Sequence, residues 1–292
     1  MKVAVIGGGA IGGVIAEAAV ASGHDVLVCV RTRIDRLTIE REGETHTVAA
    51  ELATETTGPP ADVVFVTVKA TDTATTTAHL AALCGPDTLT VVVQNGIDQG
   101  ERLRPHLPVD AGPATGANAY VAAERLGPGQ IRHNSGDLLL MDAAHADRAL
   151  EAIAAGMRVR GTDDMRTEAW RKMLANLVAN PLTAITLRRM DVLRSPGMQQ
   201  VARTILTEAL AVARADGAVL DDEMIDTILS GTARYGAETG SSMLYDRQDG
   251  RPMEHRYLTG EVVRRAAIHG IAVPVHSTLL ALLDAVDVDV DR

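Results

Sequence analysis

Aromatic and positively charged side chains are both in short supply in this chain. Its 292 residues include one Trp, one Phe and four Tyr, so the core must be built from aliphatic residues, and platforms for stacking nucleobases are missing. Lys and Arg number 28 against 38 Asp and Glu, which gives a formal net charge of -10. Such a surface repels polyanions and argues against nucleic acid or an anionic membrane as a partner. A small ligand is still compatible, because a local cationic pocket can exist on an acidic protein.

Cysteine is equally rare. Cys29 and Cys84 each sit in an apolar stretch without a CxxC spacing, which predicts reduced, buried residues of a cytoplasmic protein. Neither a signal peptide nor a membrane span is visible, since the chain enters an apolar strand at once.

Two kinds of catalytic site are not expected. The nine histidines show no HExxH spacing, so no metal site is predicted, and no G-x-S-x-G elbow supports a serine hydrolase. We expect four of these histidines at the surface or at helix ends: His133, His255, His269 and His276.

The first half of the chain alternates between strand and helix. Short apolar runs at 2–6, 25–30, 61–69 and 87–96 are nearly continuous in valine, as parallel strands covered on both faces should be. Helical periods lie between them, at roughly 10–22 and in "TDTATTTAHLAALCG". This alternation predicts an α/β domain with an open, doubly wound parallel sheet.

The second half is predicted to be an all-helical domain. Apolar residues recur at helical spacing from about residue 165, with Ser195-Pro196 as a helix start and Gly217 as a stop. The segment "GSSMLYDRQDGRPMEHR" (240–256) interrupts this pattern and is expected to be neither helix nor strand at its centre. The length and the change of pattern predict two domains, 1–164 and 165–292.

Closely spaced glycines join the first strand to the first helix. Gly7, Gly9 and Gly12 form G-x-G-x-x-G around Gly8, Ala10 and Ile11. The first glycine permits the tight turn, the second lets the backbone approach a pyrophosphate, and the third lets the helix pack against the strand. The pattern predicts a dinucleotide site in this strand-turn-helix context, against the alternative of a merely tight turn.

The second strand ends in "CVRTR", where NAD-binding proteins usually place an acidic residue. Arg31 and Arg33 instead suit a 2'-phosphate, so NADP is favoured, unless both arginines are solvated loop residues. Lys69 and Gln94-Asn95-Gly96 close two later strands, at the sheet edge where ligands of such folds bind. A lysine that reaches solvent and a simple Asn-Gly turn are the alternatives.

Lys172, Asn176 and Asn180 are spaced four apart within "WRKMLANLVANPLTAIT" and share one helix face. Polar groups in such an apolar helix need hydrogen-bond partners, which a substrate or a neighbouring helix could supply. In the segment 240–256, Ser242 and Glu254 either face the lysine across an interdomain cleft or belong to a flexible polar loop, together with Ser241 and Asp246.

These residues together resemble the ketopantoate reductases (2-dehydropantoate 2-reductases) over essentially the full chain. The motifs that carry the resemblance, in order, are the N-terminal glycines, Arg31, Lys69 after "VFVTV", "QNG", "GPGQIRH", "WRKMLANLVANPLTAIT", "SSMLYDRQDGRPMEHRYLTG" and "HGIAVPVHSTL". The resemblance implies an N-terminal Rossmann domain, an all-α C-terminal domain and an active site between them.

The resemblance also implies a role for each residue. Lys172 would be the general acid that protonates the carbonyl oxygen, with Glu254 as the second catalytic residue, binding the substrate hydroxyl. Asn176, Asn180 and Ser242 would hold the 2-oxo acid, and Asn95 would serve both substrate and nicotinamide ribose. Arg31 and Lys69 would lie near the adenosine 2'-phosphate, and Glu254 would also lie near the cofactor. Besides these and Asn95, the residues expected to bind the cofactor are those of the glycine turn: Gly7, Gly8, Gly9, Ala10, Ile11 and Gly12.

The implied reaction is NADPH-dependent reduction of 2-dehydropantoate to (R)-pantoate, in pantothenate and coenzyme A biosynthesis. A lysine in a dry cleft could act as the acid with its pKa lowered towards about 7 to 8, and Glu254 nearby would oppose a larger drop. Arg256 and Thr259 replace an acidic residue and an asparagine that are common in the family. Another branched 2-oxo acid is therefore an alternative substrate. A non-catalytic NADP-binding sensor is an alternative function for the same fold. The protein could also form a homodimer.

Overall fold

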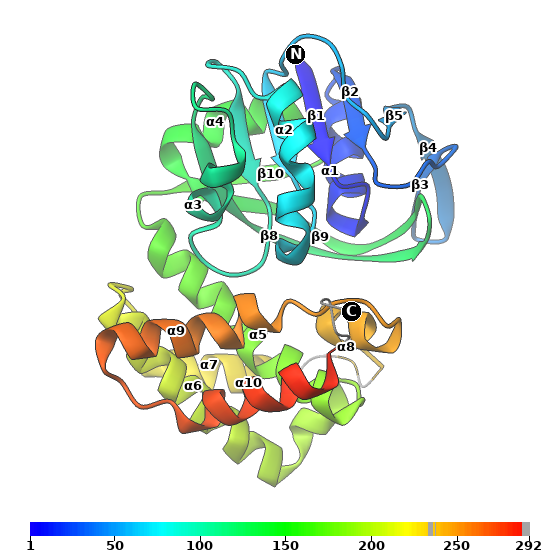
Figure 1. The fold of residues 1–292 in the computed structure, drawn as a ribbon. Helices are drawn as coiled ribbons and strands as arrows, with labels where there is room; N and C mark the ends of the chain where they lie inside the picture. The colour runs from blue at the N-terminus through cyan, green and yellow to red at the C-terminus, as the bar shows by residue number, and fades with distance from the viewer. Residues whose placement is uncertain (233–235, 237, 288–292) are drawn as a thin grey trace. The chain divides into compact units, whose positions relative to one another are not determined.

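The computed structural model describes residues 1–232, 236 and 238–287, and divides into two compact units (Figure 1). The first unit comprises Met1–Gln94 and Asp98–Met165, and the second comprises Asn95–Ile97 and Arg166–Arg292. The short segment at 95–97 thus groups with the C-terminal part of the chain although it follows a strand of the first unit.

The first unit contains a six-stranded parallel sheet, as predicted. Its strand order is β5-β2-β1-β6-β7-β8, in which the first strand in sequence lies at the centre and the chain winds outward to both sides. The bounds are β1 (Lys2–Ile6), β2 (Asp25–Cys29), β5 (Glu51–Ala53), β6 (Val63–Val66), β7 (Leu89–Val92) and β8 (Ala114–Gly127).

Four further strands extend this sheet, which is therefore not parallel throughout. The long strand β8 turns at Pro128-Gly129 into the antiparallel β9, because a two-residue turn can join only antiparallel neighbours. Gly129 adopts a φ of +69° in this turn. The added strands are β3 (Leu37–Arg41), β4 (Glu44–Val48), β9 (Gln130–Asp142) and β10 (Arg158–Thr162).

Helices cover both faces of the parallel strands. Alternate residues of β1 point to opposite sides: Val3 and Val5 pack with α1 and α4, whereas Ala4 and Ile6 pack with α2 and α3. Cys29 and Cys84 are buried and free, as predicted. The helical segments are α1 (Ala10–Ala21), η1 (Ala70–Thr76), α2 (Thr77–Leu83), α3 (Gln99–Leu103), η2 (Arg104–His106) and α4 (Ala143–Ile153).

The described part of the second unit is helical and contains no strand, as Figure 1 shows in green to red. Ser195 caps α6 by accepting a hydrogen bond from the Met198 N–H, and Gly217 follows its end with a φ of +92°. Residues 233–235 of one predicted helical stretch lie outside the described residues. The elements are α5 (Met165–Thr186), η3 (Met190–Arg194), α6 (Pro196–Ala215), α7 (Glu223–Thr232), α8 (Ser242–Gln248), η4 (His255–Tyr257), α9 (Thr259–His269) and α10 (Pro274–Val286).

Candidate active site

The turn between β1 and α1 shows why glycine is required there. Gly7 adopts a φ of +115°, and a Cβ added to Gly12 would lie 1.9 Å from the Gly7 carbonyl oxygen. A Cβ on Gly9 would meet nothing within 4 Å. Gly7 and Gly12 are thus fixed by the geometry of the turn itself, whereas Gly9 borders open space.

The same turn fits a phosphate group. Gly9 is the N-cap of α1 and has no side chain that could cap the helix, so the first N–H groups of α1 are left for another acceptor. Ala10 and Ile11 form the first turn of this helix, and Gly8 packs beside Val30. The backbone here matches what the pyrophosphate of a dinucleotide needs.

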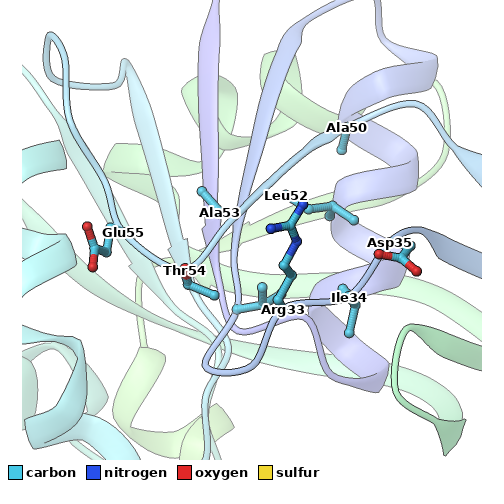
Figure 2. A pocket seen from close by; sticks show the side chains of 9 residues that line it. Arg33, Ile34, Asp35, Ala50, Leu52, Ala53, Thr54 and Glu55 are labelled. Carbon is cyan, nitrogen blue, oxygen red and sulfur yellow. The ribbon is translucent and has the colours of Figure 1, made fainter.

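The loop after β2 places Arg31 and Arg33 on the surface. Neither arginine forms an ion pair with any residue in the described ranges. Arg33 lines a hollow of about 510 Å³, and Figure 2 shows Asp35 and Glu55 on opposite sides of its side chain in this view. The hollow is lined by Val30, Arg33, Ile34, Asp35, Ala50, Leu52, Ala53, Thr54 and Glu55.

A buried glutamine ties the ends of β6 and β7 together. Gln94 Nε2 donates to the Val68 carbonyl oxygen and to Thr73 Oγ1, both at 3.0 Å. Lys69 is the N-cap of η1 between these two acceptors. The segments that follow β6 and β7 are therefore linked by the side-chain hydrogen bonds of Gln94.

Helix α5 carries Lys172 and Asn176, both half-buried, and the buried Asn180. Burial lowers the pKa of the Lys172 ammonium to about 8, and the negative charge of Glu254 acts in the opposite direction. The expectation of a lowered lysine pKa opposed by Glu254 is confirmed. A lysine with such a pKa can release and regain a proton near neutral pH.

Asn180 connects α5 to α8. Its Oδ1 accepts hydrogen bonds from Ser242 Oγ at 3.3 Å and from the Met243 N–H at 3.4 Å. Because a backbone N–H can only donate, the Met243 contact fixes the amide with its oxygen towards α8. No described residue accepts a hydrogen bond from Asn180 Nδ2. The helix-to-helix alternative is thus real for the oxygen, while the nitrogen remains available to a ligand.

Glu254 lies directly before η4 and is buried. Asn95 Nδ2 donates to Glu254 Oε2 at 3.0 Å. The second unit therefore brings the Asn95 amide, the Glu254 carboxylate and the charge of Lys172 into one electrostatic group.

One expectation about this region is wrong. The first half of 240–256 is the helix α8, capped by Ser241, whose Oγ accepts from the Leu244 N–H. Because Met243 and Leu244 are buried, tertiary packing stabilises a helix whose short polar sequence does not signal one. His255 and His276 stand in the first turns of η4 and α10, in agreement with the expectation of surface or helix-end positions. Both are buried, and carboxylates accept hydrogen bonds from their ring nitrogens.

No catalytic or binding role was predicted for Asp246 from the sequence. It is 2% exposed and lies four residues after Ser242 on α8, where Arg251 Nε donates to its Oδ1 at 3.2 Å. The spacing to Ser242 is the signal that could have drawn attention to it. Among the described residues there is also no group of three or more His, Cys, Asp or Glu side chains arranged to hold a metal ion.

Comparison with protein families decides the relationship of the chain. Residues 3–144 match the family model described as "Ketopantoate reductase PanE/ApbA", and residues 164–287 match "Ketopantoate reductase PanE/ApbA C terminal". The chain belongs to the ketopantoate reductase family. It thus shares with the family a Rossmann-type α/β domain followed by an all-α domain.

Individual ketopantoate reductases are similar over nearly the full length. The chain is 34% identical over 289 residues to a 2-dehydropantoate 2-reductase from Caulobacter vibrioides, covering 97% of this chain and 98% of the relative. A Mycobacterium tuberculosis 2-dehydropantoate 2-reductase is 32% identical over 293 residues, covering 97% of each chain. The solved ketopantoate reductase from Ralstonia eutropha superposes with a TM-score of 0.89 at 31% identity, covering 98% of each chain.

The two departures from the ketopantoate reductase pattern have different surroundings. Arg256 is exposed and its Nε donates to Asp284 Oδ1 at 2.9 Å. Thr259 is fully buried at the start of α9, and its hydroxyl has no hydrogen-bond partner in the part of the chain that the structure describes. Arg256 is thus hydrogen-bonded to α10, whereas the buried Thr259 hydroxyl forms no hydrogen bond with any described residue.

Proposed function

We propose that this protein is an NADPH-dependent oxidoreductase that converts 2-dehydropantoate (ketopantoate) to (R)-pantoate. The membership of the ketopantoate reductase family supports the reaction type. The observation that carries the chemistry is the half-buried Lys172, whose pKa of about 8 suits a proton donor near neutral pH.

Lys172 is the general acid. Reduction of a ketone leaves negative charge on the carbonyl oxygen, which must be protonated or stabilised where it forms. The Lys172 ammonium donates its proton to that oxygen. Glu254 keeps the lysine from losing its proton too readily, because its negative charge favours the ammonium form.

The remaining polar groups of the second unit orient the substrate. Asn180 Nδ2, directed away from α8, donates to the 2-oxo acid together with Asn176, and Ser242 adds a hydroxyl from α8. Glu254 accepts from the hydroxyl of the substrate, while Asn95 holds Glu254 and the nicotinamide ribose.

The first unit holds the cofactor. When bound, NADPH supplies the hydride that reduces the carbonyl carbon. The Gly7 to Gly12 turn and the first N–H groups of α1 bind its pyrophosphate. Arg31, which has no ion-pair partner among the described residues, and Lys69 recognise the 2'-phosphate.

The test is NADPH oxidation, followed by absorbance, with a panel of 2-oxo acids that includes ketopantoate. The proposal predicts a kcat/KM for ketopantoate well above those for the other acids and faster reaction with NADPH than with NADH. Activity confined to another branched 2-oxo acid would contradict the substrate and direct attention to Arg256 and Thr259. Tight NADPH binding without turnover of any acid would contradict the enzymatic function.

The cofactor preference has its own variant. Arg31→Ala should weaken NADPH binding by at least about tenfold and leave NADH binding nearly unchanged, because only NADPH carries the phosphate. Arg160→Ala, which removes an exposed arginine from β10, is the matched control and should affect neither cofactor. Equal losses for both cofactors in Arg31→Ala would reject the phosphate contact.

A further inference from the structure

Two aspartates close the last helix of the chain. Asp284 lies in the final turn of α10 and Asp287 is its C-cap, so the two are spaced three apart and share a face. Carboxylates at a helix C-terminus stand beside the negative end of the helix dipole, which is unfavourable. Such a placement therefore needs compensating partners from another segment.

The partners are the residues on both sides of Glu254. Asp287 Oδ1 accepts a hydrogen bond from the Met253 N–H at 3.1 Å. Asp284 Oδ1 accepts from His255 Nε2 at 2.8 Å and from Arg256 Nε at 2.9 Å. The other ring nitrogen of His255 lies 3.5 Å from Asp287 Oδ2. Glu254 thus sits between two anchored neighbours.

We propose that Asp284 and Asp287, the aspartate clamp, are positioning residues that fix the Glu254 carboxylate by holding the chain immediately before and after it. This inference rests on the proposed function, because it assigns the clamp to the partner of the general acid. It also gives Arg256, which departs from the family pattern, a place in the same arrangement.

Burial strengthens the clamp. Met253 is 2% exposed and His255 is 1% exposed, so the donor groups are shielded from water, whereas the side chains of Asp284 and Asp287 are 38% and 12% exposed. The bond to Asp287 therefore gains most from its surroundings, because hydrogen bonds are electrostatically stronger away from water. Hydrogen bonding from His255, followed by that from Arg256, holds the pKa of Asp284 below its usual value. The single short turn of η4 cannot fix Glu254 by itself, because so few residues make few hydrogen bonds of their own.

The position of Glu254 has a measurable consequence at Lys172. The Glu254 charge supports the ammonium form of Lys172 against the effect of burial. If the clamp is released and Glu254 moves away, this support weakens and the pKa of Lys172 falls. A contribution of the clamp to stability alone would leave that pKa in place.

The experiment is a double-mutant cycle on the ligand-free, full-length protein. The rate of Lys172 acetylation is measured against pH by peptide mass spectrometry in wild type, Asp287→Asn, Glu254→Gln and the double variant. We expect Asp287→Asn to lower the Lys172 midpoint by about half a pH unit or more, and to have no further effect in the Glu254→Gln background. An equal shift in both backgrounds would overturn the proposal, since Asp287 would then act through its own charge.

Asp284→Asn repeats the cycle with a more exposed aspartate, in case Asp287→Asn does not fold. Asp226→Asn is the control for loss of one acidic partner, because Asp226 pairs with Arg203 on the second unit's surface. It should leave the Lys172 midpoint unchanged. Labelling needs no substrate, so the clamp is decided even if the wild-type enzyme reduces no 2-oxo acid and the proposed function fails.

Discussion

The two units build their candidate sites in different ways. In the first unit, the candidate pyrophosphate part of the site is one continuous turn of backbone, where Gly7 and Gly12 are fixed by sterics and Gly9 borders open space. In the second unit, side chains come from α5, α8, the segment before η4 and the distant residue Asn95. A site built from local backbone is decided by a few adjacent residues, whereas a site built from dispersed side chains depends on how the helices pack.

The largest effect should come from the glycine turn. Gly12→Ala places a Cβ 1.9 Å from the Gly7 carbonyl oxygen, which cannot move aside as a flexible side chain would. We expect it to destabilise the first unit by about 3 kcal/mol and to abolish measurable NADPH binding. Urea unfolding followed by circular dichroism, with calorimetric titration of NADPH, measures both.

Gly9→Ala is the matched variant. Because no atom lies within 4 Å of the added Cβ, the stability should change by no more than about 1 kcal/mol, the cost of alanine at this N-cap, while NADPH affinity still falls. Unchanged NADPH affinity in Gly9→Ala would show that the open side of this turn does not receive the cofactor.

The asparagines of α5 separate support from binding in the second unit. Asn180→Ala removes the acceptor of the Met243 N–H and should lower the free energy of unfolding by about 1 to 3 kcal/mol, besides lowering kcat/KM. Asn176→Ala, at a half-buried position, should lower kcat/KM with a stability change below about 0.5 kcal/mol. Equal stability losses in both variants would contradict the different environments assigned to them.

The smallest effect concerns the buried His276. Burial lowers its pKa, against the opposing hydrogen bond to Glu208, whose Oε2 lies 2.9 Å from His276 Nδ1. Below the usual histidine pKa of 6.5 the unfolded chain therefore binds a proton more readily than the folded one. As the pH decreases below 6.5, the free energy of unfolding should therefore decrease, by no more than about 1.4 kcal/mol per pH unit from this group.

Urea unfolding at a series of pH values tests this, with His276→Gln as the comparison. The variant lacks the titrating ring, so its stability should depend less on pH below 6.5. The same pH dependence in both proteins would show that His276 does not contribute.

The difference between the units also decided what could be predicted from the sequence. The valine-rich strands, the glycine turn and the helical second half follow from local patterns, and the structure confirms them. Lys172 and Asn180 could be placed on one helix face by spacing alone. For Ser242 and Glu254 the local pattern left a polar loop as the alternative, and the family resemblance rather than spacing singled them out, because they reach α5 only through the packing of α8 and the segment before η4.

The errors have the same origin. The antiparallel hairpins β3–β4 and β8–β9 were not predicted, because their strands lack the valine-rich runs that marked the parallel strands. The helix α8 was predicted as a loop because its polar residues are typical of loops. The helix is stabilised by burial against other parts of the chain, which the local sequence does not show. The aspartate clamp likewise could not be inferred, since Asp284 and Asp287 are far in sequence from the residues they hold.

The central claim is that Lys172 is the general acid, and the most direct test is the pH dependence of kcat/KM for ketopantoate at saturating NADPH in wild type and Lys172→Met. The account predicts that wild-type kcat/KM falls as pH rises through about 8, because kcat/KM follows the protonation state of the enzyme before the 2-oxo acid binds, and the ammonium is lost there. It predicts that Lys172→Met lowers kcat by at least about 100-fold, removes this pH dependence and keeps NADPH affinity within about twofold. A Lys172→Met variant with near wild-type kcat and the same pH profile would contradict it.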